Sequence, residues 1–479
     1  MVRHVPIRHF TLATHSNHGT GRAYIDVLPD DVLLQIFHFR RVDGINTFGV
    51  TWEWEALVHV CRRWRRLIFA WPRNLDLRLV CTRGTPVQGM LDIWPNIPII
   101  IFDQDDSQST SDLPILNVLA ALECHNRIYG IWLDKLTYSQ WQLFTAATRT
   151  RFPALTFLEL GPGVETDSVL PIEFLGGTAR NLRIVRLHGI PFPALPHLLL
   201  SSKDLVDLQL RDVPIEGYVS PMAMVAALSV LSNLRKLSIG FRSPKSPTDR
   251  TIDFERPRRV VLPGLTDFGF RGVSEYLEDF VARIDAPSLL HFEVALFNRL
   301  VFDLPKLASF ITRTENLRSF DQADVALRVR DIRLSLLSPG REVYIALEIS
   351  CQEVDWQLSS LVQMCGQLRS LVSEVEWLDL AEKRILQPNV QDDVGDALWL
   401  ELFQKFPGLK TLRLAKKVGS LVSQALQGPD ADNATEVLPA LRDLSLEGHE
   451  QFLSIQKAIM AFISARHRRS DVVVRRWQR

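Results

Sequence analysis

Cysteine is scarce in this chain, and its few copies are scattered. The 479 residues contain five cysteines, Cys61, Cys81, Cys124, Cys351 and Cys365, and no two of them have Cys-x-x-Cys spacing. The scarcity argues against a disulfide framework, and the missing pairs argue against a structural zinc site. We therefore expect five reduced thiols in a reducing compartment, with Cys61 largely buried.

Long apolar runs and an excess of charge of either sign are also missing. No stretch of 18 apolar residues occurs, and the short run Ile97–Phe102 fits a buried strand better than a membrane span. Lys and Arg together number 55, as do Asp and Glu, so nothing indicates a nucleic-acid or membrane partner. The basic, polar first 22 residues lack the apolar core of a secretory signal. We expect a protein of the cytoplasm or nucleus.

The motifs that carry much of enzyme chemistry are absent. The sequence has no P-loop, no dinucleotide-binding glycine pattern and no Gly-x-Ser-x-Gly nucleophile elbow. Cys124 and His125 are adjacent, and neighbouring side chains point apart on a helix or strand, so they do not make a metal-ligand pair. The acidic runs 103–106 and 428–432 have the composition of solvated turns. We expect no catalytic residues, no metal site and no cofactor.

What the sequence does contain is an internal repeat, Leu-x-x-Leu-x-Leu, in which other apolar residues are tolerated. Between Ile128 and Leu368, neighbouring copies begin 23 to 31 residues apart, except from Leu317 to Leu368, where we expect a degenerate copy near 344–349. Turn-forming pairs such as Pro-Ala, Arg-Asn, Ser-Asn and Pro-Gly precede many copies. The clear copies begin at Leu155, Leu182, Leu205, Leu234, Leu265, Leu289, Leu409 and Leu441, and weaker ones at Ile128, Leu317 and Leu368.

Each copy predicts one strand, and the segments between copies predict helices. Alternate side chains of a strand face opposite ways, so the second and third apolar residues of a copy share one face. The intervening segments have helical apolar spacing, as in Val225, Leu228 and Leu231. One strand and one helix cannot bury their apolar faces alone, whereas stacked units form a continuous core beside a parallel sheet.

In these features, residues 128 to 450 resemble the leucine-rich-repeat family. The resemblance implies an α/β solenoid, an irregular horseshoe with a parallel sheet on its concave face. The family's usual asparagine after the last leucine is missing, so we expect uneven curvature without an asparagine ladder. An ordinary α/β domain with leucine-rich strands, or a (β/α) barrel, stays open as the alternative. The residues found near the asparagine position are Gly161, His188, Arg211 and Gly240.

Residues 25–72 have a different pattern, typical of two helices. The first helix is expected to start near Pro29, because proline suits the first turn and two acids follow it. The second is expected from Trp54 to about Trp71, ahead of Pro72. Its arginines, Arg62, Arg63, Arg65 and Arg66, are expected to form a solvated basic stripe.

This small all-α segment resembles an F-box. The family's motifs match Leu28-Pro29-Asp30, Ile36-Phe37 and Val60-Cys61-Arg62-Arg63-Trp64, although the stretch between Arg40 and Trp54 is longer than usual. A module this short buries too little apolar surface to be stable alone. The resemblance implies docking on a Skp-type adaptor through a face that contains Leu28, Pro29, Ile36, Phe37, Leu57, Val60, Cys61 and Trp64.

The expected organisation has four parts: a disordered tail over 1–24, the F-box-like module over 25–72, the solenoid over 73–453, and a C-terminal cap with a basic tail over 454–479. The resemblance implies a non-enzymatic substrate-recognition subunit of a Skp–cullin–F-box ubiquitin ligase. The module would bind the adaptor and through it a cullin, and the repeats would hold an unknown target protein for ubiquitin-dependent degradation. A repeat scaffold without ligase engagement is the main alternative, and an unrecognised α/β hydrolase is a more distant one.

The target is expected on the concave sheet face. The third and fifth residues of each copy should point away from the core and line up there as solvated side chains. Their mixed charge, with two apolar residues at the N-terminal end, suits a protein partner. The alternative that loops, and not these strand residues, bind the target stays open. The candidate target-binding residues are Phe157, Glu159, Ile184, Arg186, Asp207, Gln209, Lys236, His291, Glu293 and Arg413.

Overall fold

The computed structural model describes residues 24–40, 57–71, 75, 77–82, 87–102, 113–161, 169–243, 259–297, 304–328, 331–350, 354–382, 396–425, 437–447, 452–466 and 472–477. The chain divides into two compact units, residues 1–79 and 80–479. The tail expected over 1–24 lies outside the described residues except for Tyr24, as do Cys351 and the two acidic runs.

The first unit contains a 3-10 turn η1 (Tyr24–Val27) and two helices, α1 (Asp30–Arg40) and α3 (Arg62–Ala70). The prediction of one continuous second helix from Trp54 is wrong. Leu57 and Val58 are helical, but a turn follows and Cys61 is extended. The Cys61 Sγ accepts a hydrogen bond from the Trp64 amide at 3.5 Å, so the sulfur caps a new helix that starts at Arg62.

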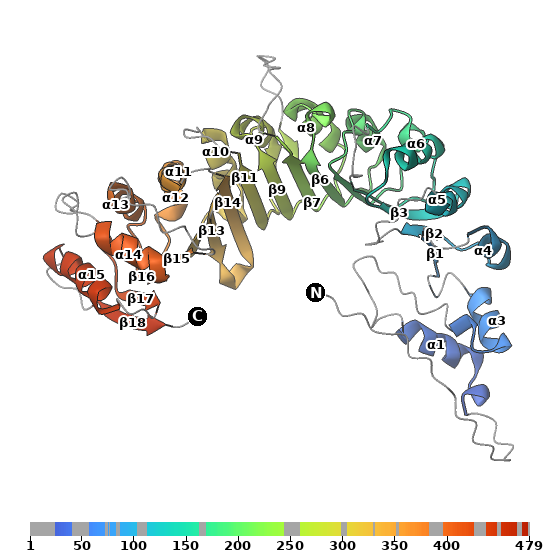
Figure 1. The fold of residues 1–479 in the computed structure, drawn as a ribbon, viewed down its shortest axis with the longest axis horizontal. Coiled ribbons are helices and arrows are strands. Elements are labelled where there is room, and N and C mark those ends of the chain that lie inside the picture. The colour runs from blue at the N-terminus through green and yellow to red at the C-terminus, as the bar shows by residue number, and fades with distance from the viewer. Residues whose placement is uncertain are drawn as a thin grey trace. The chain divides into compact units, whose positions relative to one another are not determined.

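The second unit alternates strands with helices (Figure 1). Its first part contains β1 (Leu79–Cys81), α4 (Val87–Ile93), β2 (Ile99–Phe102), α5 (Leu113–Glu123), β3 (Ile128–Leu133), α6 (Tyr138–Ala147), β4 (Phe157–Leu160), η2 (Phe174–Gly177), β5 (Ile184–His188), α7 (Leu195–Ser201), β6 (Asp207–Val213), η3 (Ile215–Gly217), α8 (Pro221–Leu228) and β7 (Lys236–Phe241).

The chain continues through β8 (Val260–Val261), β9 (Asp267–Gly272), α9 (Ser274–Val281), β10 (Ile284–Asp285), β11 (His291–Leu296), α10 (Pro305–Arg313), η4 (Glu315–Leu317), β12 (Gln322–Leu327), β13 (Asp331–Ser338), η5 (Pro339–Arg341) and β14 (Val343–Ser350). The last part contains α11 (Val354–Gln367), α12 (Arg369–Val372), β15 (Trp377–Glu382), α13 (Asp396–Gln404), β16 (Thr411–Leu414), α14 (Lys416–Ala425), β17 (Asp443–Glu447), α15 (Phe452–Arg466) and β18 (Val473–Trp477).

One sheet of 16 strands organises this unit, in the order β1-β2-β3-β4-β5-β6-β7-β9-β11-β14-β13-β12-β15-β16-β17-β18. β8 and β10 form a separate pair. Because the large sheet is open from its first strand to its last, the barrel alternative is excluded. Figure 1 shows helices α5 to α10 on the outer side of the sheet. The opposite side, formed by the strand residues that point away from these helices, is called the inner face below. The expected α/β solenoid with a mostly parallel sheet is therefore observed.

The repeat sets the strand register. In β4, Leu158 and Leu160 are each 1% exposed, whereas Phe157 and Glu159 between them are half-buried. This is the predicted alternation, and the parallel pairing repeats it from strand to strand. The helix positions Val225, Leu228 and Leu231 are buried as predicted.

The pairs that precede the copies join one repeat to the next. The residue before the first leucine reaches a backbone carbonyl of the previous repeat: Asn181 Nδ2 donates to the Pro153 oxygen at 2.6 Å, and Ser288 Oγ to the Pro263 oxygen at 2.7 Å. Gly408 occupies the same position, and a Cβ there would lie 2.8 Å from the Ser373 oxygen. The position before the first leucine therefore links one repeat to the next in at least these two places.

The structure departs from the predicted repeats between residues 317 and 382. β13 is antiparallel to both of its neighbours, β12 and β14, although β14 continues the parallel register of β11. The copy predicted at Leu368 is wrong, because Arg369–Val372 is helical and the strand is β15. The copy predicted at Leu317 is also displaced, because the strand is β12, from Gln322.

The C-terminal segment adds one more unit to the sheet. Residues 454–479 were expected to form a cap and a basic tail, but α15 spans 452–466 and β18 pairs in parallel with β17. Arg475 and Arg476 therefore belong to a strand, and the sheet extends beyond the predicted end at 453.

Candidate protein-interaction surfaces

The predicted adaptor-binding residues divide into a core group and an exposed group. Phe37 and Leu57 are 6% and 9% exposed, so they belong to the core of the first unit. Leu28, Cys61 and Trp64 are half-buried, which corrects the expectation of a largely buried Cys61. The exposed group is Pro29, Ile36 and Val60, and the last two side chains are 41% and 58% exposed.

Two arginines of the predicted basic stripe make hydrogen bonds within the first unit. Arg63 donates to the Leu28 carbonyl oxygen at 2.6 Å and to the Asp30 carboxylate at 2.6 and 3.0 Å. Arg65 donates to the Val58 carbonyl oxygen at 2.9 Å. The description of these two arginines as merely solvated is therefore wrong: Arg63 holds the Leu28-Pro29-Asp30 turn against α3.

An aromatic contact completes this arrangement. The Phe37 and Trp64 rings meet edge to face, with centroids 4.8 Å apart, so α1 packs on α3 through them. The unit also leaves several large apolar side chains exposed to solvent. The exposed large apolar residues among its described residues are Ile25, Val27, Ile36, Val60 and Trp71.

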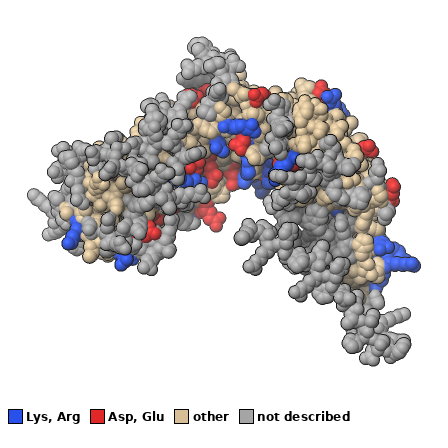
Figure 2. Space-filling view, in the orientation of Figure 1, with Lys and Arg blue, Asp and Glu red and all other residues tan. Residues whose placement is uncertain are grey.

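On the second unit, the predicted target-binding residues form two rows across the inner face. The first row pairs Phe157, Ile184, Asp207, Lys236, Asp267 and His291 on successive strands, and the second pairs Glu159, Arg186, Gln209, Ser238, Gly269 and Glu293. The structure thus brings together all the predicted residues except Arg413, which lies farther along the sheet on β16. Figure 2 shows acidic and basic side chains next to one another on this side of the sheet.

Arg186 is the centre of an ion-pair network rather than a solvated side chain. Its guanidinium donates to Asp207 at 2.8 Å and to Glu159 at 3.2 Å. Burial alone would lower the pKa of Arg186, but the hydrogen bonds and charges of Asp207 and Glu159 outweigh it and raise the pKa. Asp207 and Gln209 are only 8% and 3% exposed, which corrects their assignment as solvated residues.

A second network links the regular strands to the antiparallel hairpin. His291 Nδ1 lies 2.9 Å from the Asp267 carboxylate, and the His291 ring stacks on Tyr344 with centroids 4.8 Å apart. The Tyr344 hydroxyl donates to Glu293 at 2.9 Å, and Arg333 reaches the same carboxylate at 3.3 Å. Burial and the bond to Glu293 raise the pKa of Tyr344 to about 12. β9, β11, β13 and β14 are therefore joined on the inner face.

Residues near the ends of several strands make contacts between neighbouring repeats. Asp212, at φ +50° where the β6 pairing is irregular, accepts from Arg271 at 3.5 Å and lies 2.8 Å from His188 Nε2. Gly240, on the strand between Asp212 and Arg271, has no side chain to block this contact. At Gly161, a Cβ would lie 2.0 Å from Asp134 Oδ1, so a larger residue there would displace the Asp134 side chain.

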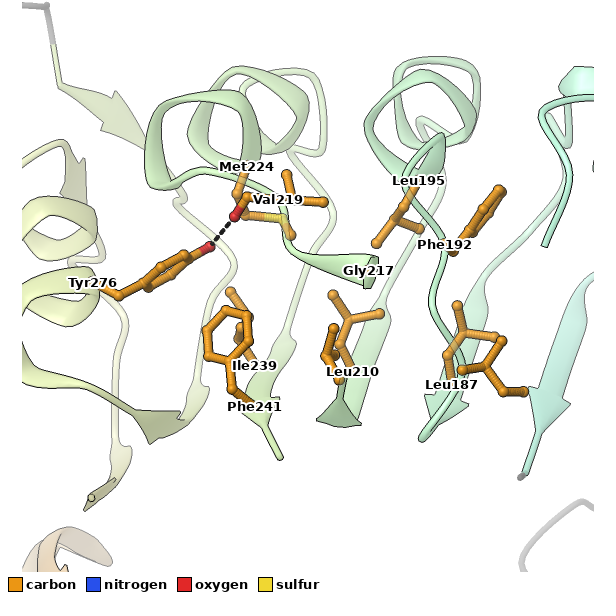
Figure 3. Close-up of a pocket in the computed structure, with 12 residues that line it drawn as sticks. Leu187, Phe192, Leu195, Leu210, Gly217, Val219, Met224, Ile239, Phe241 and Tyr276 are labelled. Carbon is orange, nitrogen blue, oxygen red and sulfur yellow. Dashed lines mark hydrogen bonds between the residues drawn. The ribbon is translucent and has the colours of Figure 1, made fainter. Parts of the chain in front are cut away.

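Two hollows differ in what they can hold. One, of about 20 Å³, lies between the sheet and helices α7 to α9, lined by apolar side chains such as Leu210, Met224 and Phe241 (Figure 3). It has room for about one water and is a packing gap. The other, of about 180 Å³, opens on the inner face over Ser238, Gly269 and Ala346. The second hollow is large enough to receive part of a partner.

Sequence reasoning missed several residues of the inner face. Tyr344, Arg333 and Arg271 were not candidates, and neither was Trp377, which pairs with Gln322 and Thr411 and is 40% exposed. The signal for Trp377 was present in the sequence: Val375, Leu378 and Leu380 match the repeat spacing, nearer to the strand than the copy assigned to Leu368.

Among the described residues, no group of three or more His, Cys, Asp or Glu side chains could hold a metal ion. Across the same residues, no helix has the length and apolar character needed to cross a membrane.

No protein-family model and no curated protein match the sequence. Among solved structures, the chain is similar to the leucine-rich repeat-containing protein LegL7 from Legionella pneumophila, with 13% identity and a TM-score of 0.27. The match covers 72% of this chain and 93% of that chain.

Proposed function

We propose that this chain is the substrate-recognition subunit of a Skp–cullin–F-box ubiquitin ligase. The observation that carries the proposal is the first unit, in which Arg63 fixes the Leu28-Pro29-Asp30 turn to α3 while apolar side chains stay exposed. The same unit contains the three motifs by which residues 25–72 resemble an F-box.

The adaptor-binding face consists of Pro29, Ile36 and Val60, supported from below by Phe37 and Leu57. Exposed apolar side chains gain free energy when a partner removes them from water, by about 25 cal/mol per Å². The buried residues fix the positions of the exposed ones, so both groups matter for docking, but only the exposed group can be changed without disturbing the core.

The repeats hold the target protein on their inner face. Mixed charges, half-buried aromatic side chains such as Phe157 and the exposed Trp377 suit a protein surface, because aromatic and arginine side chains dominate binding energy at such interfaces. The chain thereby supplies proximity and orientation, and the ubiquitin-transfer chemistry belongs to other subunits.

Co-purification with a Skp-type adaptor tests the proposal. The variant Ile36→Asp/Val60→Asp places charges on the proposed docking face and should reduce adaptor recovery at least tenfold, since truncated interface anchors cost on the order of 2 kcal/mol. The matched control is Leu116→Asp, which changes a side chain that is 57% exposed on α5 of the second unit. Circular dichroism checks that both variants are folded.

Two outcomes would refute the ligase assignment: undiminished adaptor recovery with the double variant, or no binding by the unmodified chain. The second outcome would favour the alternative function, a repeat scaffold for protein interactions that does not engage a ligase.

A further inference from the structure

The hollow on the inner face exists because its floor is poor in side chains. Ser238, Gly269 and Ala346 lie in one row across β7, β9 and β14, and Ala295 lies in the next row on β11. A Cβ added at Gly269 would lie 3.3 Å from Ser238 Oγ, so a larger residue at this position would take up space in the hollow.

The size of the hollow indicates what can enter it. At about 180 Å³, it is smaller than the pockets of roughly 300 Å³ or more that usually hold small molecules. It is open toward the inner face, where the proposed target binds. One projecting side chain of a protein is therefore a better fit than a free metabolite.

The acidic and basic side chains at the rim of the hollow differ in how much of their hydrogen-bonding capacity is used. The Glu293 carboxylate accepts from Tyr344 and Arg333, and Glu348 accepts from Arg328 at 3.4 Å. Each guanidinium has five N–H donors, yet among the described residues Arg271 hydrogen-bonds only to the Asp212 carboxylate, at 3.5 Å, and Arg333 only to that of Glu293. Hydrogen-bond donors are thus in surplus at this rim.

Arg271 is also held in a suitable position. Its side chain is 58% exposed, and its guanidinium lies 5.9 Å from the centre of the Phe297 ring. The Asp212 contact across Gly240 restrains it weakly, so it can turn to a stronger acceptor. Arginine matches carboxylates well because its planar fork donates two parallel hydrogen bonds.

We propose that this hollow receives an aspartate or glutamate side chain of the target protein, which Arg271 and Arg333 bind. The proposal rests on the proposed function in one respect, that the inner face holds a protein. Glu293 and Glu348, the carboxylates that a lysine or arginine of the target would need, already pair with Arg333 and Arg328.

A library of random peptides displayed on phage provides the probe. We expect selection on the full-length chain to enrich peptides with an acidic residue at a fixed position. Synthetic copies of these peptides should bind at least tenfold more weakly to Arg271→Gln/Arg333→Gln, since a hydrogen bond to a charged group contributes about a factor of ten or more. Replacing the acidic residue of the peptide by its amide should cause a similar loss.

Controls separate this result from misfolding and from the adaptor. Arg369→Gln changes an exposed arginine on α12 and should bind the peptides as the unmodified chain does. The single variant Arg271→Gln, at an exposed side chain, should keep the native melting temperature and still lose affinity. The inference would be overturned if no peptides were enriched, or if the enriched peptides lacked an acidic residue. It would also be overturned if Arg271→Gln/Arg333→Gln bound the peptides as tightly as Arg369→Gln does. Adaptor recovery is measured separately, so its loss would refute the ligase assignment and not this site.

Discussion

The carboxylate of Glu278 caps the helix that contains Leu307. It accepts a hydrogen bond from the Leu307 amide at 2.7 Å and one from the Lys306 amide at 2.8 Å. Glu278 lies on α9 and is 8% exposed, whereas the two amides belong to the first turn of α10. The first amides of a helix have no partner within it, and its dipole favours a negative charge there. This side chain therefore joins one repeat to the next.

Replacing Glu278 by alanine should destabilise the second unit by about 2 kcal/mol, because two helix-start amides, one buried and one part-buried, lose a charged acceptor. We expect the melting temperature to fall by a few degrees in calorimetry. Glu173→Ala, at an exposed glutamate outside this contact, serves as the control. Equal melting temperatures for the two variants would show that the cap contributes little.

The network around Arg186 leads to a prediction about charge reversal. Arg186→Glu places a third carboxylate beside Glu159 and Asp207, so it should lower the free energy of unfolding by about 2 kcal/mol or more. Arg180→Glu, at an exposed arginine in the turn before β5, should change it by less than about 0.5 kcal/mol. Denaturant unfolding measures both. Similar losses in the two variants would mean that the network is not the cause.

Asp267 should contribute to the acid sensitivity of the fold. Burial opposes the shift, but hydrogen bonds from Thr266 and His291 prevail and lower the pKa of the Asp267 carboxyl. A lowered folded-state pKa gives stability that is present above the unfolded value of about 4 and is lost as the pH falls through the folded value. Asp267→Asn should therefore melt slightly below the unmodified protein at pH 7, and the difference should shrink as the pH falls below about 4. A constant difference would contradict this assignment.

The cysteines should differ in reactivity. Cys61, Cys81, Cys124 and Cys365 are free thiols, and burial raises the pKa of Cys365 to about 12. Because the thiolate is the reactive form, we expect the half-buried Cys61 and Cys124 to be alkylated in the native protein, and the buried Cys81 and Cys365 only after unfolding. Peptide mass mapping checks this order. A disulfide between any two cysteines, or early labelling of Cys365, would contradict it.

Much of the fold could be predicted because the repeat imposes a period of two on each strand. Once Leu155 and Leu158 defined a copy, it followed that Leu160 points into the core. The antiparallel β13 could not be predicted in this way, since its alternating apolar residues look the same in either direction. The false copy at Leu368 has a similar cause: leucines three residues apart also suit a helix, and Leu368 and Leu371 are buried there.

The candidate sites were less predictable than the fold. Spacing placed Arg186 and Asp207 on the inner face, but it could not show that they bond each other, since that depends on the strands that become neighbours. The same limit applies to Arg63, whose partners Leu28 and Asp30 lie more than 30 residues away in the sequence. Contacts between distant segments decide which side chains are free for a partner.

The antiparallel hairpin at β12, β13 and β14 has a consequence for how the chain folds. These three strands pair with sequence neighbours, whereas other adjacent strands of the sheet are separated by an intervening helix or a long segment. Short-range pairing costs the least loop-closure entropy, so it can form before its surroundings. In a stack whose units contact mainly their neighbours, growth can then proceed from this point toward both ends. Pulsed hydrogen exchange during refolding should show the earliest amide protection in β12 to β14, well before the N-terminal strands.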